Sequence, residues 1–157
     1  MAEFSGRLRA VGRVAILVSR YNEIVTSKLL QGALDCCREA GLAADCVDVV
    51  WVAGAFELGA AAAAAAATRR YACLVALGTV IRGETAHFEF VAGQATQSLG
   101  EVATRAALPI GFGLLTVDTM EQALARAGGA AGNKGHEAAA AAITMADVIA
   151  QMRAAGA

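Results

Sequence analysis

Side chains that could handle a proton and an anion gather between Gly78 and Phe88, directly after an apolar run, Ala72 to Leu77. Only 17% of the chain is charged, and it has two histidines. Loops at strand ends are where rigid folds place their chemistry. We therefore predict a functional site here, and its candidate side chains are Arg82, Glu84, Thr85 and His87.

His87 is the candidate for proton transfer, because a histidine titrates near neutrality and can both accept and donate a proton. The alternative is a surface or capping histidine. Gly83, Glu84 and Thr85 resemble an anion cradle, since they offer backbone N–H groups and a hydroxyl at a predicted helix start. The Glu84 carboxylate would have to point away from the anion. The alternative here is an ordinary N-cap, with the Thr85 hydroxyl satisfying helix amides.

A second candidate segment, Ala53 to Glu57, combines small residues that let a ligand approach the backbone with Phe56 and Glu57 at a helix start. Glu57 could equally be a carboxylate matched to the helix dipole. Tyr21 could stack on a planar ring or be an ordinary, partly buried tyrosine.

Basic residues near Gly128 to Gly135, which we predict to be a glycine-rich linker, are further candidates. Arg126 and Lys134 could meet a phosphate, but exposed basic residues near helix ends are usually solvated. We expect His136 to be solvated. Neither the G-x-G-x-x-G fingerprint nor the G-x-x-x-x-G-K-[ST] loop occurs, which disfavours dinucleotide and nucleoside triphosphate enzymes.

Length and composition indicate one domain, residues 13–157, preceded by an arm, residues 1–12. The hydrophobic fraction of 57%, much of it alanine, favours self-association. A net charge of -1 without a basic run argues against a nucleic-acid partner. The four cysteines have no metal-ligand spacing, so we expect reduced, partly buried thiols.

The apolar segments favour a soluble, cytoplasmic protein without a membrane partner. Residues 1–12 carry two arginines and no apolar core, unlike a secretory signal. The longest apolar run, Leu58 to Ala67, is about half the length that crosses a bilayer.

The periodicity alternates between short apolar runs and helical segments. We predict strands over Arg13–Ser19, Cys46–Val52, Ala72–Val80 and Leu108–Val117. We predict helices over Thr26–Ala40, Phe56–Arg70 and Ala86–Ala106, a short one after an N-cap at Thr119 to about Ala127, and a last one over Glu137–Ala154. This alternation predicts an α/β fold, a three-layer α/β/α sandwich with a four-stranded parallel sheet. Ligands bind such sheets beyond the carboxyl ends of the strands.

Three segments in order, W-V-A-G-A-F-E (Trp51 to Glu57), G-T-V-I-R-G-E-T-A-H-F (Gly78 to Phe88) and R-A-G-G-A-A-G-N-K-G (Arg126 to Gly135), resemble those of the lumazine synthase family. R-Y-N-E-I-V-T-S-K-L-L-Q-G-A (Arg20 to Ala33) also fits. The resemblance runs from about Gly12 to the C-terminus and implies the flavodoxin-like form of the fold.

The resemblance implies a condensation of 5-amino-6-(D-ribitylamino)uracil with 3,4-dihydroxy-2-butanone 4-phosphate, the penultimate step of riboflavin biosynthesis, with no metal or organic cofactor. It implies that Tyr21 stacks on the pyrimidine ring and that His87 transfers the proton. The other implied contacts are with the ribityl chain and ring (Ala55, Phe56, Glu57), with the ring edge through backbone groups (Thr79, Val80, Ile81), and with the phosphate (Glu84, Thr85).

The resemblance also implies a homo-oligomer, a pentamer that can pair into a decamer or close into a sixty-subunit icosahedral capsid. Phe112 and Arg126 would then come from a neighbouring subunit, with Arg126 on the phosphate, Phe112 over the ring and Lys134 close by. The glycine-rich segment, which has no insertion, resembles that of capsid-forming members. Riboflavin synthase is the protein partner that the resemblance suggests.

The chain departs from the family pattern at three positions. Ala53 and Gly59 stand where prolines are common, which predicts a softer loop, and Tyr21 stands where phenylalanine is frequent and keeps the aromatic face. Two alternative functions are a non-catalytic flavin or lumazine binder and a purely structural shell protein. A binder would need neither His87 nor Arg126.

Overall fold

Four parallel strands form the central sheet of the protein, in the order β2-β1-β3-β4. The computed structural model describes all residues from 1 to 157. The strands are β1 (Arg13–Ser19), β2 (Val47–Val52), β3 (Tyr71–Ile81) and β4 (Ile110–Val117). The predicted strands are confirmed to within two residues at each end, and β1 agrees with its prediction throughout.

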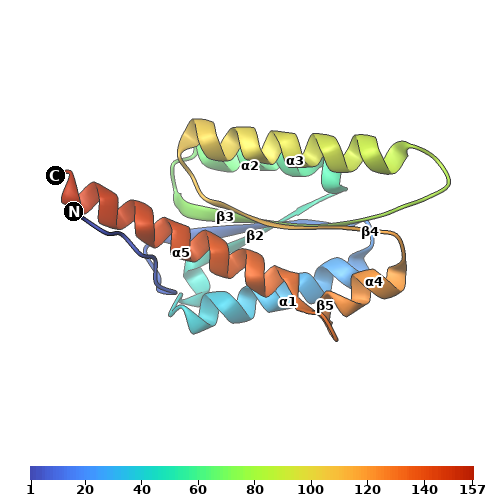
Figure 1. The fold of residues 1–157 in the computed structure, drawn as a ribbon, viewed down its shortest axis with the longest axis horizontal. Helices are drawn as coiled ribbons and strands as arrows, with labels where there is room; N and C mark the ends of the chain where they lie inside the picture. The colour runs from blue at the N-terminus through green and yellow to red at the C-terminus, as the bar shows by residue number, and fades with distance from the viewer.

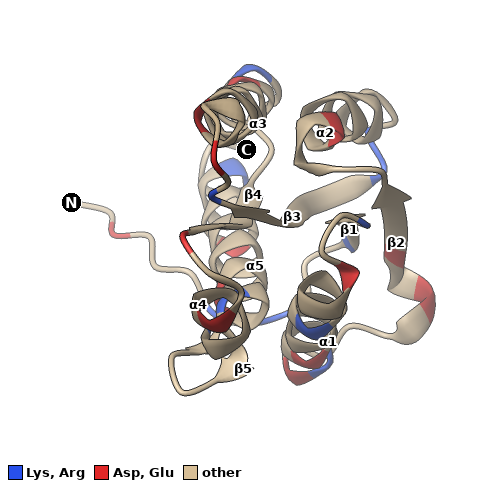
Figure 2. Cartoon of the chain, turned by 90° about the vertical axis from the view of Figure 1, so that its right-hand side faces the viewer, with Lys and Arg blue, Asp and Glu red and all other residues tan.

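Helices cover both faces of this sheet (Figures 1 and 2). One face carries α1 (Glu23–Glu39), α4 (Met120–Ala125) and α5 (Lys134–Ala155), and the other carries α2 (Leu58–Ala67) and α3 (His87–Ala106). The predicted three-layer α/β/α architecture is therefore confirmed. Two short 3-10 helices, η1 (Ala44–Cys46) and η2 (Ala55–Glu57), precede β2 and α2.

The core consists of two apolar clusters, one on each side of the sheet. Along β1, Val14, Ile16 and Val18 belong to the larger cluster, whereas Ala15 and Leu17 belong to the smaller. Successive side chains of a strand point to opposite faces, so a strand covered on both faces needs apolar residues at every position. This explains why the apolar run in the sequence is continuous.

Two helix starts differ from the sequence prediction by three residues, and α2 is shorter than the predicted helix Phe56–Arg70, because η2 occupies its start and the helix ends at Ala67. Helix α1 begins at Glu23 rather than Thr26, because Asn22 takes a left-handed conformation (φ 60°) that turns the chain directly from β1 into the helix. Helix α5 begins at Lys134 rather than Glu137. The side-chain oxygen of Asn133 accepts the N–H groups of Gly135 (2.9 Å) and His136 (3.2 Å), which makes Asn133 the N-cap.

The prediction of a glycine-rich linker from Gly128 to Gly135 was therefore wrong. The segment forms a small antiparallel hairpin of β5 (Ala127–Gly129) and β6 (Gly132–Asn133), followed by the first residues of α5. Gly128 (φ 104°) and Gly132 (φ 81°) adopt the left-handed conformations that such a tight turn requires. The amide of Asn133 also donates to the carbonyl oxygen of Lys28 at 3.0 Å and so ties the hairpin to α1.

Helix α2 packs closely on α3 because its contact residues are small. A Cβ atom added at Gly59 would overlap the hydroxyl of Ser98 on α3, so this position leaves no room for a larger side chain. The alanines that follow complete the narrow helix. None of the five α-helices combines the length and hydropathy that crossing a membrane requires.

Three of the four cysteines, Cys36, Cys37 and Cys73, are buried in the larger cluster. Burial raises the pKa of the Cys36 and Cys37 thiols to about 11 and that of Cys73 to about 12. All three are therefore protonated at neutral pH and poor nucleophiles. The expectation of free, largely buried thiols is confirmed.

The first residues of the chain contain no helix or strand, and residues 5–9 run along α5, where the Ser5 carbonyl oxygen accepts from the Gln151 amide at 2.8 Å. Asp147 on α5 has no exposed surface and holds this arm. Its carboxylate accepts the Arg7 N–H at 2.8 Å and pairs with the Arg9 guanidinium at 2.6 Å. The Arg7 N–H, helped by Gln151 and Arg9, lowers the pKa of Asp147.

We expect acid or an Asp147→Asn substitution to release the arm. A carboxyl whose pKa is lowered by folding stabilises the docked arm above its unfolded-state pKa, and this contribution is lost as the pH falls through the lowered pKa. Amide hydrogen exchange of residues 1–9 should accelerate at neutral pH in the variant. Asp35→Asn, which removes an exposed carboxylate beside Arg38, is the matched control. Unchanged exchange in Asp147→Asn would contradict the role of this carboxylate.

Candidate active site

The segments that follow β1, β2 and β3 are bonded together at one end of the sheet. The Tyr21 N–H donates to the carbonyl oxygen of Ala53 at 3.0 Å, and the Asn22 amide donates to that of Thr79 at 3.0 Å. Three predicted site segments, far apart in sequence, thus meet at the carboxyl ends of parallel strands. Asn22 was not among the predicted site residues, although an asparagine between a strand and a helix is a recognisable signal of a turn.

The segment after β2 is held by its own glutamate. The Glu57 carboxylate accepts the Gly54 N–H at 2.9 Å, and the Glu57 N–H donates to the Gly54 carbonyl oxygen at 3.2 Å. Glu57 therefore has a structural role as a cap, whereas its alternative interpretation was a carboxylate matched to the helix dipole. These two bonds hold the turn in which Ala53 and Gly59 had led us to expect a softer loop.

Two aromatic side chains at this end of the sheet are open to solvent. Tyr21 is 74% exposed and Phe56 is 58% exposed, whereas Ala55 between the two segments is buried. Exposed aromatic faces are unusual on a surface without a function and suit stacking on a planar ligand. The tyrosine is thus not the partly buried residue of the alternative interpretation.

The end of β3 provides free backbone groups. The ladder to β1 stops at Leu77, whereas the ladder to β4 continues to Ile81. The Thr79 carbonyl oxygen, on the β1 side, is bonded by Asn22. Alternate residues of a strand direct their N–H and C=O to the same neighbour, so Ile81 also directs both groups to the β1 side, where no strand lies. Val80 directs its groups to β4.

The segment before α3 is exposed throughout, from Arg82 to His87. The Thr85 hydroxyl accepts the His87 N–H at the long distance of 3.4 Å, so its capping bond is weak. The His87 imidazole makes no hydrogen bond to the chain, and neither does the Glu84 carboxylate. His87 is the first residue of α3, at the end of the helix where backbone N–H groups are unpaired.

A separate pocket of about 240 Å³ lies along β4, the edge strand. Phe112, Arg126 and Lys134 line it together with residues 113–117. Arg126 is half-buried at the end of α4, where its guanidinium donates to the Gln122 carbonyl oxygen at 3.1 Å. Lys134 pairs with Glu137 at 2.8 Å. The predicted basic residues are therefore not simply solvated, because they converge on one hollow with an exposed aromatic ring.

The two groups of side chains do not meet within one chain. The pocket on β4 contains neither Tyr21 nor Phe56 nor His87. Phe112 is in register with Ala76, five residues before the end of β3 at Ile81, which places it about 17 Å short of that end. One chain therefore presents two halves of a candidate site, one with the aromatic side chains and His87 at its strand ends and a cationic one at its edge.

A four-stranded parallel sheet in the order β2-β1-β3-β4, covered by helices on both faces, defines a flavodoxin-like α/β protein. The family model of 6,7-dimethyl-8-ribityllumazine synthase matches residues 12–150. The chain belongs to this family, as the sequence motifs suggested.

Two known members show the extent of the similarity. The 6,7-dimethyl-8-ribityllumazine synthase of Sodalis glossinidius (strain morsitans) is 51% identical over 143 residues, which cover 90% of this chain and 92% of that protein. The protein of the same name from Edwardsiella ictaluri (strain 93-146) is 50% identical with the same coverage. The match includes both halves of the candidate site.

Proposed function

We propose that this chain is a transferase that condenses 5-amino-6-(D-ribitylamino)uracil with 3,4-dihydroxy-2-butanone 4-phosphate to 6,7-dimethyl-8-ribityllumazine, with release of phosphate and water. Family membership over residues 12–150 carries the proposal. The chemistry of the site supports it. Imine formation and ring closure need proton transfer, elimination of phosphate needs a cation, and both substrates must be held in register.

The pyrimidine substrate belongs at the strand ends. Tyr21 and Phe56 offer exposed aromatic faces for the ring, and the outward N–H and C=O of Ile81 offer polar backbone groups to its edge. Val80 would support this edge from the β4 ladder, and Thr79 through its bond to Asn22. Ala55 and Glu57 would line the ribityl chain. The Glu57 carboxylate can serve a hydroxyl there with the oxygen that does not accept the Gly54 N–H.

The phosphate belongs between the loop before α3 and a cationic side chain. The Thr85 hydroxyl and the unpaired N–H groups at the start of α3 are donors for an anion, whereas Glu84 turns its carboxylate to solvent. Arg126 provides the charge, with Lys134 beside it and Phe112 over the ring. His87, next to these donors, transfers protons to and from the four-carbon substrate.

A complete site requires two chains, because the cationic half and the proton-transfer half lie apart in one. We therefore place Phe112, Arg126 and Lys134 of one subunit against the strand ends of the next, in a pentamer. Sedimentation distinguishes a pentamer from a decamer or a sixty-subunit capsid. A five-subunit species would contradict the capsid that the uninterrupted glycine-rich hairpin suggests.

Co-expression of two impaired variants tests the shared site. In mixed assemblies of His87→Ala and Arg126→Ala chains, about a quarter of the sites combine an intact His87 with an intact Arg126 from the neighbour, if chains mix at random. We expect about a quarter of wild-type activity from the mixture. A rate equal to the mean of the two variants assembled separately would show that each site lies within one chain.

The reaction itself is tested by mixing both substrates with the protein and following lumazine fluorescence. Formation of the product with release of phosphate supports the transferase. A non-catalytic binder would take up the lumazine or a flavin without turnover, and a structural shell protein would do neither. Absence of product at micromolar protein would contradict the proposal.

A further inference from the structure

The loop that carries the candidate proton-transfer residue has little support of its own. Residues 83–86 are exposed, and a Cβ atom added at Gly83 would meet nothing within 4 Å. No side chain between Arg82 and His87 makes a hydrogen bond to another element of the fold. The loop also lies at the far end of the molecule from both termini (Figure 1).

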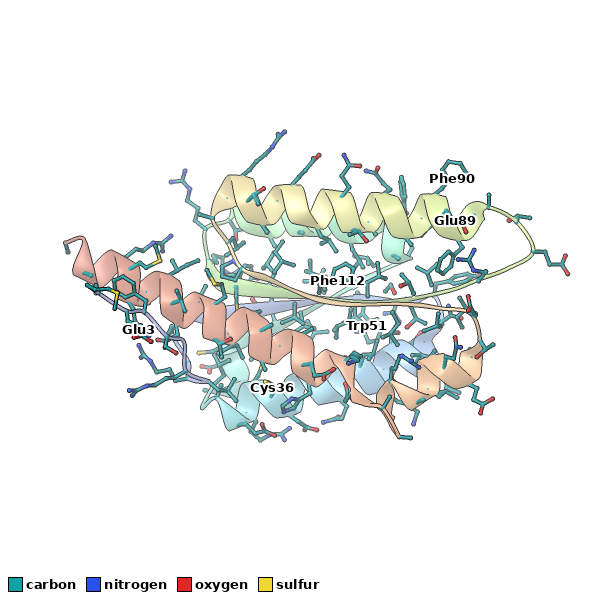
Figure 3. The ribbon with its side chains drawn as sticks, viewed as in Figure 1. Glu3, Cys36, Trp51, Glu89, Phe90 and Phe112 are labelled. Carbon is teal, nitrogen blue, oxygen red and sulfur yellow. The ribbon has the colours of Figure 1, made fainter.

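Arg82 connects the two ends of this loop to the sheet. Its N–H donates to the Val117 carbonyl oxygen at 2.9 Å, which extends the β3–β4 ladder by one residue. Its guanidinium donates through Nε to the Asp118 carboxylate at 3.1 Å and pairs through Nη1 with Glu89 in the first turn of α3. In Figure 3, Glu89 lies on the sheet side of α3 and Phe90 on the opposite side.

The same guanidinium lies 4.3 Å from the ring centroid of Phe88. Arg82 therefore contacts the two residues that directly follow His87. A planar guanidinium can donate N–H groups to two carboxylates while its face packs on an aromatic ring. The ammonium group of a lysine cannot make all three contacts.

The Asp118 end of this connection is fixed. The side-chain oxygen of Gln122 accepts the N–H groups of Asp118 (2.8 Å) and Thr119 (3.3 Å), and the Thr119 hydroxyl accepts the Gln122 N–H at 3.1 Å. This capping box anchors Asp118 to the first turn of α4. Loss of the arginine would therefore free the loop and the start of α3, while α4 keeps its own cap.

We infer that Arg82 is a positioning residue for His87 that holds the start of α3 against Asp118, and this inference rests on the proposed function. Arg82 is a poor phosphate ligand. Its Nε and Nη1 are occupied by carboxylates, and one positive charge beside two negative ones leaves the cluster negative. The cluster is also largely exposed, so ion pairs of this kind contribute little to folding.

The test replaces Arg82 by glutamine in the assembled protein. We expect kcat to fall about tenfold, because a displaced proton-transfer group loses its alignment. KM for the phosphorylated substrate should stay unchanged, as should the melting temperature. A raised KM with unchanged kcat would instead make Arg82 a phosphate ligand and overturn the inference. Arg38→Gln, which removes an exposed arginine paired with Asp35 on α1, is the matched control.

A second comparison shows whether Arg82 acts through His87. In a His87→Ala background, Arg82→Gln should have no further effect on kcat, because the group that it positions is gone. An equal fall in both backgrounds would overturn the inference. Arg82→Lys should restore only part of the rate, and full restoration would show that charge alone suffices.

Hydrogen exchange separates a failure of this inference from a failure of the proposed function. Amides of residues 83–90 should exchange faster in Arg82→Gln than in the wild type, and those of residues 120–125 should not change. This readout does not need turnover. If the wild type forms no lumazine, the proposed function fails while the exchange result still stands. Unchanged exchange of residues 83–90 would overturn the positioning role even in an active enzyme.

Discussion

Arg126→Ala is expected to raise KM for 3,4-dihydroxy-2-butanone 4-phosphate by about 30- to 150-fold. A bidentate, charge-assisted contact between an arginine and a phosphate contributes about 2–3 kcal/mol to binding, and its loss corresponds to this increase in KM. The effect on kcat should be smaller, because the phosphate contact is made in the ground state as well as in the transition state. Steady-state kinetics with the second substrate saturating would measure both.

The controls for Arg126 separate charge from geometry. Arg126→Lys keeps the charge but loses the planar fork, so it should show an intermediate KM. Arg153→Ala removes an arginine from the last turn of α5, outside both halves of the site, and should leave KM unchanged. KM for the pyrimidine substrate should also stay unchanged in Arg126→Ala. An unaltered KM for the phosphorylated substrate would contradict the phosphate role.

His87→Ala is expected to lower kcat about a hundredfold without abolishing the reaction. Positioned proton transfer contributes about 10²- to 10⁴-fold, and the lower end applies where much of the acceleration comes from holding two substrates in register. KM for both substrates should change little, since His87 is exposed and other groups hold the ring and the phosphate. Single-turnover measurements would isolate the chemical step from product release.

His136→Ala is the matched control, because His136 is the only other histidine and pairs with Glu39 at 2.9 Å on the opposite layer of the fold. Its kcat should equal that of the wild type. Equal losses in the two histidine variants would point to a general loss of stability. A wild-type rate in His87→Ala would remove His87 from the mechanism.

The strands could be predicted closely because their signal is local. A strand covered on both faces must be apolar on both sides, and β1 is apolar from Val14 to Val18 and β3 from Ala72 to Leu77. Helix starts were predicted less well. The start of α1 depends on the left-handed Asn22, and the start of α5 depends on Asn133 in a glycine-rich segment. Such turns are decided by single side-chain bonds that a hydrophobic pattern does not contain.

The sequence alone determined the alternation of strands and helices, hence the sandwich, and it indicated which loops end the strands and carry His87, Tyr21 and Phe56. The tertiary structure decided which of these meet. Only the strand order β2-β1-β3-β4 brings Asn22 to Thr79 and Arg82 to Asp118, and puts Phe112 and Arg126 on an edge apart from His87. The sequence could not decide these contacts for a physical reason. Hydrophobic periodicity indicates which face of a helix or strand is buried, whereas contacts between distant residues depend on which helices and strands become neighbours.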